Sequence, residues 1–259
     1  MRRLLTSAAL VLALAAPAAA DVTVSATTSG KGMGMGANAE STTYIQGGRM
    51  RSDTQTGKQL VSTIIDLEKQ RLVTLDHRKK EAEVHDLAKM AAEMQQAIKG
   101  TPTVSFTPNG QTRQILDQTC AGYDVRVEMP FAMGGEGMNM NVVLSGPVWI
   151  AKGAPGSADY AAFYTQAAEK GMFFTDPRQA RAAPGHAKSM AEMYRAVAET
   201  GGVPYAMEVT IKFEGQGPMA AMMSRMGNTT MTTTVTNVSA GPVAAELFDV
   251  PAGWKSRTR

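Results

Sequence analysis

Short runs of alternating apolar and polar residues dominate the first half of the chain and predict β-strands. Residues 22–26 alternate in this way, and the runs 43–46 and 49–53 flank Gly47-Gly48, a two-residue signal for a tight hairpin. Further strands are predicted at residues 60–67, 71–77, 81–85, 112–116, 123–129, 138–144, 205–213 and 229–238. Successive strands joined by short turns predict an up-and-down antiparallel sheet, so the fold class is mainly β with helices (α+β).

Four segments have apolar residues at helical spacing and predict helices inserted among these strands. Asp86 is placed to cap the first helix and Ser157 the second, while Ser189 and Glu192 form the pattern of a capping box for the third. The predicted helices lie near residues 86–99, 157–171, 188–200 and 217–226. With no sharp boundary between segments, residues 21–259 are interpreted as a single domain.

In the strand at 205–213, apolar and polar residues alternate strictly, so one face of the strand is expected to be buried and the other exposed to solvent. The helices at 157–171 and 188–200 present apolar faces that can cover the buried side. If this cover packs imperfectly, an apolar cavity for a hydrophobic ligand remains between helices and sheet. The predicted ligand-binding residues are Tyr160, Phe163, Tyr194, Met207, Val209 and Ile211.

The first twenty residues resemble a secretory leader. Arg2 and Arg3 give a positive start, an apolar run follows, and Ala18-Ala19-Ala20 forms a small-residue cleavage site. We therefore expect cleavage after Ala20 and a periplasmic protein. The apolar run is too short to span a membrane, and no transmembrane segment is expected elsewhere.

Charge and cysteine content narrow the function. Removal of the leader with its two arginines leaves 24 basic residues against 23 acidic ones, close to neutrality. A dense basic stripe interleaved with aromatic residues is missing, so no nucleic-acid partner is expected. Cys120 is the single cysteine; it cannot form an internal disulfide, and we expect it to be buried on a strand.

Catalytic motifs give no support to an enzyme. The sequence contains no G-x-S-x-G, H-E-x-x-H or C-x-x-C pattern and no phosphate-binding loop. Asp66 and Asp76 lie near strand ends, where acidic residues usually form turns. We expect a non-enzymatic protein without a cofactor, whose partner is a hydrophobic ligand or another envelope protein.

The chain is also rich in methionine, with 19 residues in all. Met219, Met222, Met223 and Met226 follow helical spacing and would share one face. Three interpretations remain open: core filling, an adaptable wall of a hydrophobic cavity, and a soft-metal site, because thioethers bind Cu(I). A periplasmic copper-binding protein using these four residues is therefore the alternative function.

Five segments taken in order resemble a family of exported bacterial proteins described as a domain of unknown function. They are residues 44–51 (YIQGGRMR), 63–67 (TIIDL), 120–123 (CAGY), 149–152 (WIAK) and 248–254 (FDVPAGW). More distantly, such proteins resemble the periplasmic lipoprotein carriers and their outer-membrane receptors. This resemblance implies a strongly curved antiparallel sheet, an unclosed half-barrel, with helices packed on its concave side. No motif of this chain maps onto the lipid-gating residues of the carriers.

Overall fold

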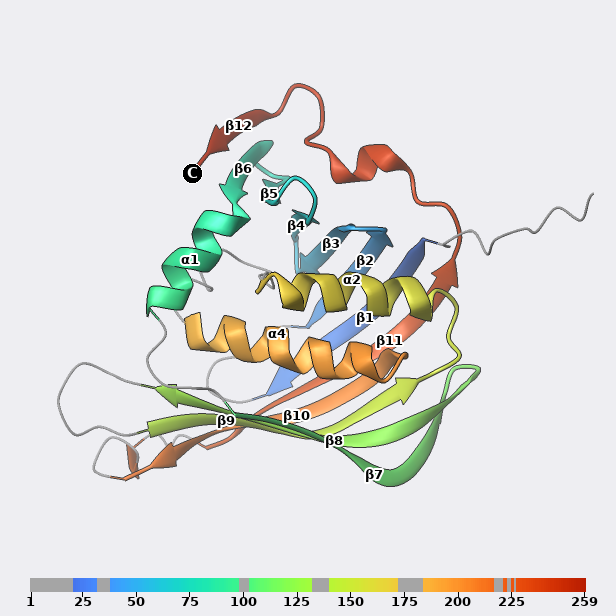
Figure 1. Cartoon of the computed structure of the whole chain (residues 1–259), viewed down its shortest axis with the longest axis vertical. Helices are drawn as coiled ribbons and strands as arrows, with labels where there is room; N and C mark the ends of the chain where they lie inside the picture. Colours follow the sequence, from blue (N-terminus) through green and yellow to red (C-terminus); the bar gives the residue numbers. More distant parts are fainter. Residues whose placement is uncertain are drawn as a thin grey trace, which may run out of the picture.

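One unclosed sheet of twelve strands forms the framework of the protein (Figure 1). The computed structural model describes residues 21–31, 38–97, 103–131, 140–171, 184–216, 221–222, 225 and 227–259. The strands are β1 (Val22–Lys31), β2 (Ala39–Gln46), β3 (Arg49–Thr56), β4 (Gln59–Asp66), β5 (Arg71–Asp76), β6 (Glu81–Asp86), β7 (Thr103–Ile115), β8 (Gln118–Phe131), β9 (Met140–Ala151), β10 (Val203–Gly215), β11 (Thr229–Ala240) and β12 (Lys255–Thr258). Their order is β12-β6-β5-β4-β3-β2-β1-β11-β10-β9-β8-β7. The predicted mainly β architecture with an unclosed sheet is confirmed.

Short turns with local side-chain bonds explain why β2–β6 form an up-and-down series. Gly47 has a φ of 55°, as a two-residue hairpin requires, and Gln46 pairs with Arg49 as predicted. At the end of β4, Asp66 Oδ1 accepts the Lys69 amide at 2.9 Å. Asp76 Oδ1 likewise accepts the Lys79 amide at 3.0 Å. These aspartates are turn formers, in agreement with the sequence-based interpretation.

Two series of adjacent strands, β1–β6 and β7–β11, meet where β1 pairs with β11. The pairing is antiparallel, with Val22 opposite Ala240, and its register shifts at a bulge between Ser25 and Ala26. Among the described strands, this ladder is the one link between the two series. The sheet is antiparallel except at its end, where β12 pairs in parallel with β6. The sequence analysis did not predict β12.

The structure describes three α-helices: α1 (Leu87–Ala97), α2 (Ser157–Glu169) and α4 (Pro184–Glu199). Asp86 caps α1 as predicted, because its Oδ1 accepts the Lys89 amide at 2.9 Å. Within the described part of the chain, no helix is both long and apolar enough to cross a membrane.

The predicted caps of α2 and α4 were wrong. Ser157 is the first residue of α2 and not its cap; the cap position is Gly156, with a φ of 70°. α4 starts at Pro184, before the proposed capping box, because proline is favoured in the first turn of a helix. Ser189 is therefore inside the helix, where its Oγ donates to the Gly185 carbonyl at 2.8 Å. Glu192 pairs with Arg195 instead of closing a capping box.

Apolar residues are buried on both faces of the sheet around β4 and β5. Ile65 and Leu72 belong to the larger core, which also contains side chains of all three helices. Ile64 and Val73 point the other way and pack against Phe248 in the C-terminal segment, residues 241–259. This segment includes the short 3-10 helix η1 (Ala245–Phe248) and runs past the strands to β12 (Figure 1). The β4 strand is therefore apolar at consecutive positions.

Cys120 is fully buried in β8, as the sequence predicts. Desolvation raises the pKa of its thiol, an effect that nearby Arg113 partly opposes. Both burial and the protonated state make the thiol a poor nucleophile.

We predict that iodoacetamide labels Cys120 in the native protein at least about 100-fold more slowly than in urea, because labelling needs an opening that costs roughly 3 kcal/mol or more. The rate is measured by mass spectrometry at pH 8. The control is the double variant Cys120→Ala/Thr119→Cys, which moves the thiol to the exposed neighbouring position of the same strand. Equal rates for wild type and control would contradict the prediction.

Candidate functional site

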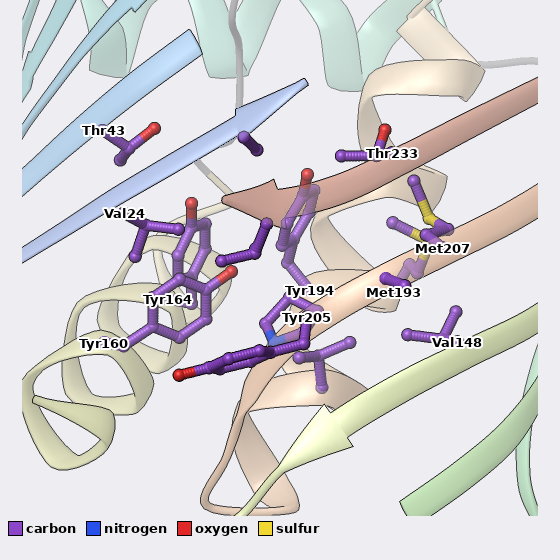
Figure 2. A pocket seen from close by; sticks show the side chains of 15 residues that line it. Val24, Thr43, Val148, Tyr160, Tyr164, Met193, Tyr194, Tyr205, Met207 and Thr233 are labelled. Atoms are coloured by element: carbon purple, nitrogen blue, oxygen red, sulfur yellow. The ribbon is translucent and has the colours of Figure 1, made fainter. Parts of the chain in front are cut away.

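A cavity of about 140 Å³ lies between the helices α2 and α4 and the strands around the β1–β11 pairing (Figure 2). The helices contribute Tyr160 and Tyr164 from α2 and Met193, Tyr194 and Val197 from α4. The strands contribute Val24 and Ala26 of β1, Thr43 of β2, Val148 of β9, Pro204, Tyr205, Ala206 and Met207 of β10, and Thr233 and Val235 of β11. The cavity is thus mostly apolar, with a few hydroxyl groups, as is typical of small-molecule sites.

A row of three tyrosines joins the two helices at the cavity wall. The ring centroids of Tyr160 and Tyr164 lie 4.5 Å apart, and the Tyr164 and Tyr194 rings are stacked with centroids 4.9 Å apart. The Tyr164 hydroxyl donates to the Met50 Sδ of β3 at 3.6 Å. Since that bond uses the proton of Tyr164, the hydrogen bond between Tyr160 and Tyr164 has Tyr160 as its donor. The row therefore connects α2, α4 and the sheet.

Burial keeps the phenols around the cavity protonated. Desolvation raises the pKa values of Tyr160, Tyr164 and Tyr194. Desolvation, with the nearby Asp117 carboxylate and the thiolate that Cys120 forms at high pH, raises the pKa of Tyr205 to about 12. At neutral pH, none of the described residues that line the cavity is charged.

The structure brings three of the six predicted ligand-binding residues to the cavity wall: Tyr160, Tyr194 and Met207. Phe163 and Val209 are buried in the larger core, and Ile211 packs against it, away from the lining. The lining residues of β1, β2 and β11 were not among those predicted from the sequence. Their alternation marked them as strand residues, but no local signal shows that β1 and β11 lie side by side.

The methionine residues proposed for Cu(I) fall mostly outside the described residues, which include neither Met219, Met223 nor Met226. Met222 is described, and its side chain is 51% exposed. The residues that the structure describes contain no group of three or more His, Cys, Asp or Glu side chains that could hold a metal ion. The copper-binding alternative stays a prediction from the sequence.

A cluster of polar side chains lies on the face of the sheet opposite the helices, where the C-terminal segment packs. Ser62 Oγ lies 2.7 Å from His77 Nε2, a spacing that in other settings activates a serine nucleophile. Here Arg51 Nη2 also donates to Ser62 Oγ at 3.1 Å, and the Trp254 ring packs edge-on against His77 at 5.1 Å. Ser62 is completely buried, so in this conformation its Oγ is not accessible to a substrate.

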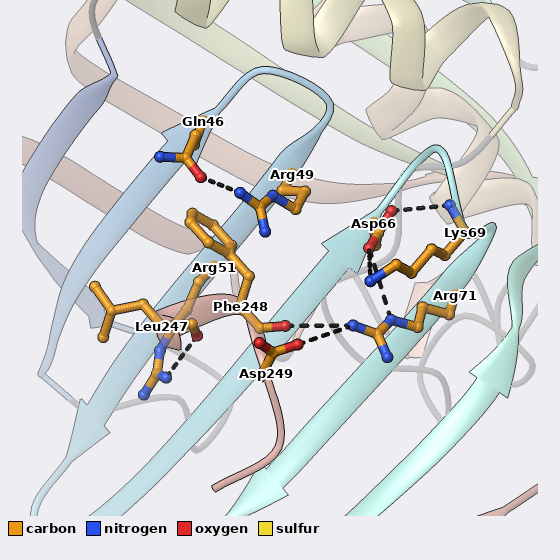
Figure 3. A network of polar contacts seen from close by, with 9 residues as sticks. All are labelled: Gln46, Arg49, Arg51, Asp66, Lys69, Arg71, Leu247, Phe248 and Asp249. Carbon is orange, nitrogen blue, oxygen red and sulfur yellow. Dashed lines mark hydrogen bonds and ion pairs between the residues drawn. The ribbon is translucent and has the colours of Figure 1, made fainter. Parts of the chain in front are cut away.

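Arginines hold the C-terminal segment against the sheet (Figure 3). Arg51 Nη1 donates to the Leu247 carbonyl at 2.9 Å. The Arg49 guanidinium lies 4.7 Å from the centroid of the Phe248 ring. Arg71 pairs with Asp249 at 3.5 Å and with the buried Asp66 at 3.7 Å. Through these contacts, the cluster holds the C-terminal segment against the sheet.

Comparisons with known proteins leave the function open. No family model and no curated protein matches the chain. The solved structure of PNGF-II in the P21 space group is similar over 93% of this chain and 32% of that chain, with 8% sequence identity and a TM-score of 0.35. The chain spans about a third of that protein, and a similarity this weak assigns neither fold nor function. The function is therefore argued from the site.

We predict that Phe248→Ala lowers the free energy of unfolding by about 3–5 kcal/mol, because Phe248 is 1% exposed and fills the smaller core. Urea unfolding followed by circular dichroism measures the change. Leu116→Ala, at a side chain that is 53% exposed, is the control and should cost less than about 0.5 kcal/mol. A loss below 1 kcal/mol for Phe248→Ala would mean that the chain end is not fastened as described.

The raised tyrosine pKa values predict a loss of stability in alkali. A group whose pKa is raised on folding contributes stability that is fully present below its unfolded pKa, about 10 for tyrosine, and is lost as pH rises toward the folded value. When the pH is raised from 10 to 11, the free energy of unfolding of Tyr160→Phe should therefore fall by about 1 kcal/mol less than that of the wild type.

Urea titrations at pH 8, 10 and 11 check this pH dependence. Tyr44→Phe, at a tyrosine outside the cavity, controls for the general effect of removing a hydroxyl. If wild type and Tyr160→Phe show the same dependence on pH, the phenol of Tyr160 is not desolvated in the folded state.

Proposed function

We propose that this protein is a non-enzymatic periplasmic carrier or sensor that binds a hydrophobic ligand in the cavity between its sheet and the helices α2 and α4. The observation that carries the proposal is the cavity itself, which has apolar walls and lies under side chains of both helices. Periplasmic localisation rests on the leader-like residues 1–20, which lie outside the described residues.

The proposed architecture is a strongly curved half-barrel with α2 and α4 on its concave side, as in the lipoprotein carriers. In support, both helices belong to the same apolar core as strands from both halves of the sheet, including β5 (Leu72) and β7 (Ile115). A helix pair seated in this way is a cover that can separate from the sheet, so the cavity can open to admit a ligand.

Cavity size limits which part of a ligand is enclosed. A cavity of about 150 Å³ engineered into another protein holds one benzene molecule, and the volume here is about 140 Å³. For a lipid or an acylated protein, the ligand classes expected from the sequence, only the end of one acyl chain fits unless the helices move apart. A chain of ten methylenes needs such a movement.

Titration with toluene tests the proposal. The titration is monitored by NMR of protein labelled with ¹³C at the methionine methyl groups. Met193 and Met207 line the cavity and should shift saturably, whereas exposed Met222 should not. Ala26→Leu, which places a larger side chain in the cavity wall, should abolish the shifts. Thr27→Leu, at the exposed next position of β1, is the matched control and should leave them unchanged.

Two results would contradict the proposed function. One is the absence of saturable shifts at Met193 and Met207 in the wild type. The other is equal binding by Ala26→Leu and Thr27→Leu, which would place the toluene elsewhere on the protein.

A further inference from the structure

The lining of the cavity restricts the charge of its ligand. Among the residues that the structure describes, none of the side chains that line it is an acid, a lysine, an arginine or a histidine. A carboxylate or an ammonium group placed there would lose its hydration without meeting an opposite charge, which is a large cost in an apolar site. A free fatty acid enclosed with its head group is therefore a poor ligand, and a neutral molecule is a good one.

Four of the six hydroxyl groups in the described lining restrict the polarity of the ligand further, because they already take part in hydrogen bonds within the protein. Tyr164 donates to Met50 Sδ, and Tyr160 donates to Tyr164. Thr43 Oγ1 donates to Ser52 Oγ at 3.4 Å.

On β11, Thr233 Oγ1 shares a hydrogen bond of 3.0 Å with Thr28 Oγ1. Hydroxyl oxygens that have given away their proton still accept hydrogen bonds. Thr43 and Tyr160 therefore offer acceptors to the cavity, and a ligand with a hydroxyl donor complements them better than one that can only accept.

We propose that the cavity selects a compact, uncharged molecule of about one-ring size that carries a hydroxyl donor, the class of simple phenols and short alcohols. This inference rests on the proposed function and specifies its ligand class. The ring or short chain fills the apolar volume between Met193 and Met207, and the hydroxyl donates to the oxygens of the wall. The aromatic rings of the tyrosine row favour a flat ligand by stacking.

Three probes of similar size separate the contributions of charge and of hydrogen-bond donation to binding. The first, p-cresol, is neutral and donates a hydrogen bond; toluene is neutral and cannot donate; benzoate is charged at pH 7. Each is titrated into the full chain with the methyl signals of Met193 and Met207 as the readout. We expect p-cresol to bind at least about fivefold more tightly than toluene, the effect of one hydrogen bond. Benzoate should bind at least tenfold more weakly than p-cresol.

The variant Thr43→Val keeps the shape of the side chain but removes the acceptor, and it should reduce the preference for p-cresol over toluene. Thr42→Val, at the neighbouring position of β2 outside the lining, is the matched control and should preserve that preference. Melting temperatures of both variants establish that each is folded.

The outcomes of this experiment distinguish the inference from the function on which it rests. If toluene binds in the cavity but benzoate binds as tightly as p-cresol, the proposed selection against charge is wrong while the hydrophobic site stands. If toluene and p-cresol bind equally, the hydroxyl preference is wrong. If no probe shifts Met193 or Met207, the proposed function itself fails.

Discussion

An unclosed sheet of this size has apolar faces that its own strands cannot bury, so other parts of the chain must cover them. Most of the remaining structure follows from this requirement. On the face that carries Ile65 and Leu72, the cover is made by helices. On the face that carries Ile64 and Val73, it is made by the C-terminal segment, fastened by arginines. Helices cover a twisted sheet less evenly than a second sheet does, and the cavity lies where their side chains do not fill the space above the β1–β11 pairing.

The features that the sequence predicted well are those that depend on neighbours along the chain. The Gly47 hairpin, the turns at Asp66 and Asp76 and the cap of α1 at Asp86 each rest on a residue that bonds or bends within a few positions of itself. Strand alternation marked the face of β10 that carries Met207, Val209 and Ile211, and of these Met207 lines the cavity.

The features that the sequence did not predict depend on distant partners or on competition between local signals. The start of α4 went to Pro184 although Ser189 and Glu192 matched a capping box, because proline is favoured in the first turn of a helix. Strand β12 is short and polar, and its pairing with β6 has no local signature. Val24 and Thr233 share the cavity wall only because β1 and β11 meet, and periodicity says nothing about which strands are neighbours.

The β1–β11 pairing also has a kinetic consequence. Thr28 and Thr233, which bond across it, are 205 residues apart in the chain, and contacts of such long range form slowly. The first six strands can assemble from local hairpins well before the β1–β11 pairing forms, while Ile65 and Leu72 are still uncovered. Such an intermediate aggregates readily, so a chaperone that shields this face until β11 arrives would raise the yield of folded protein. The cavity is then among the last features to form.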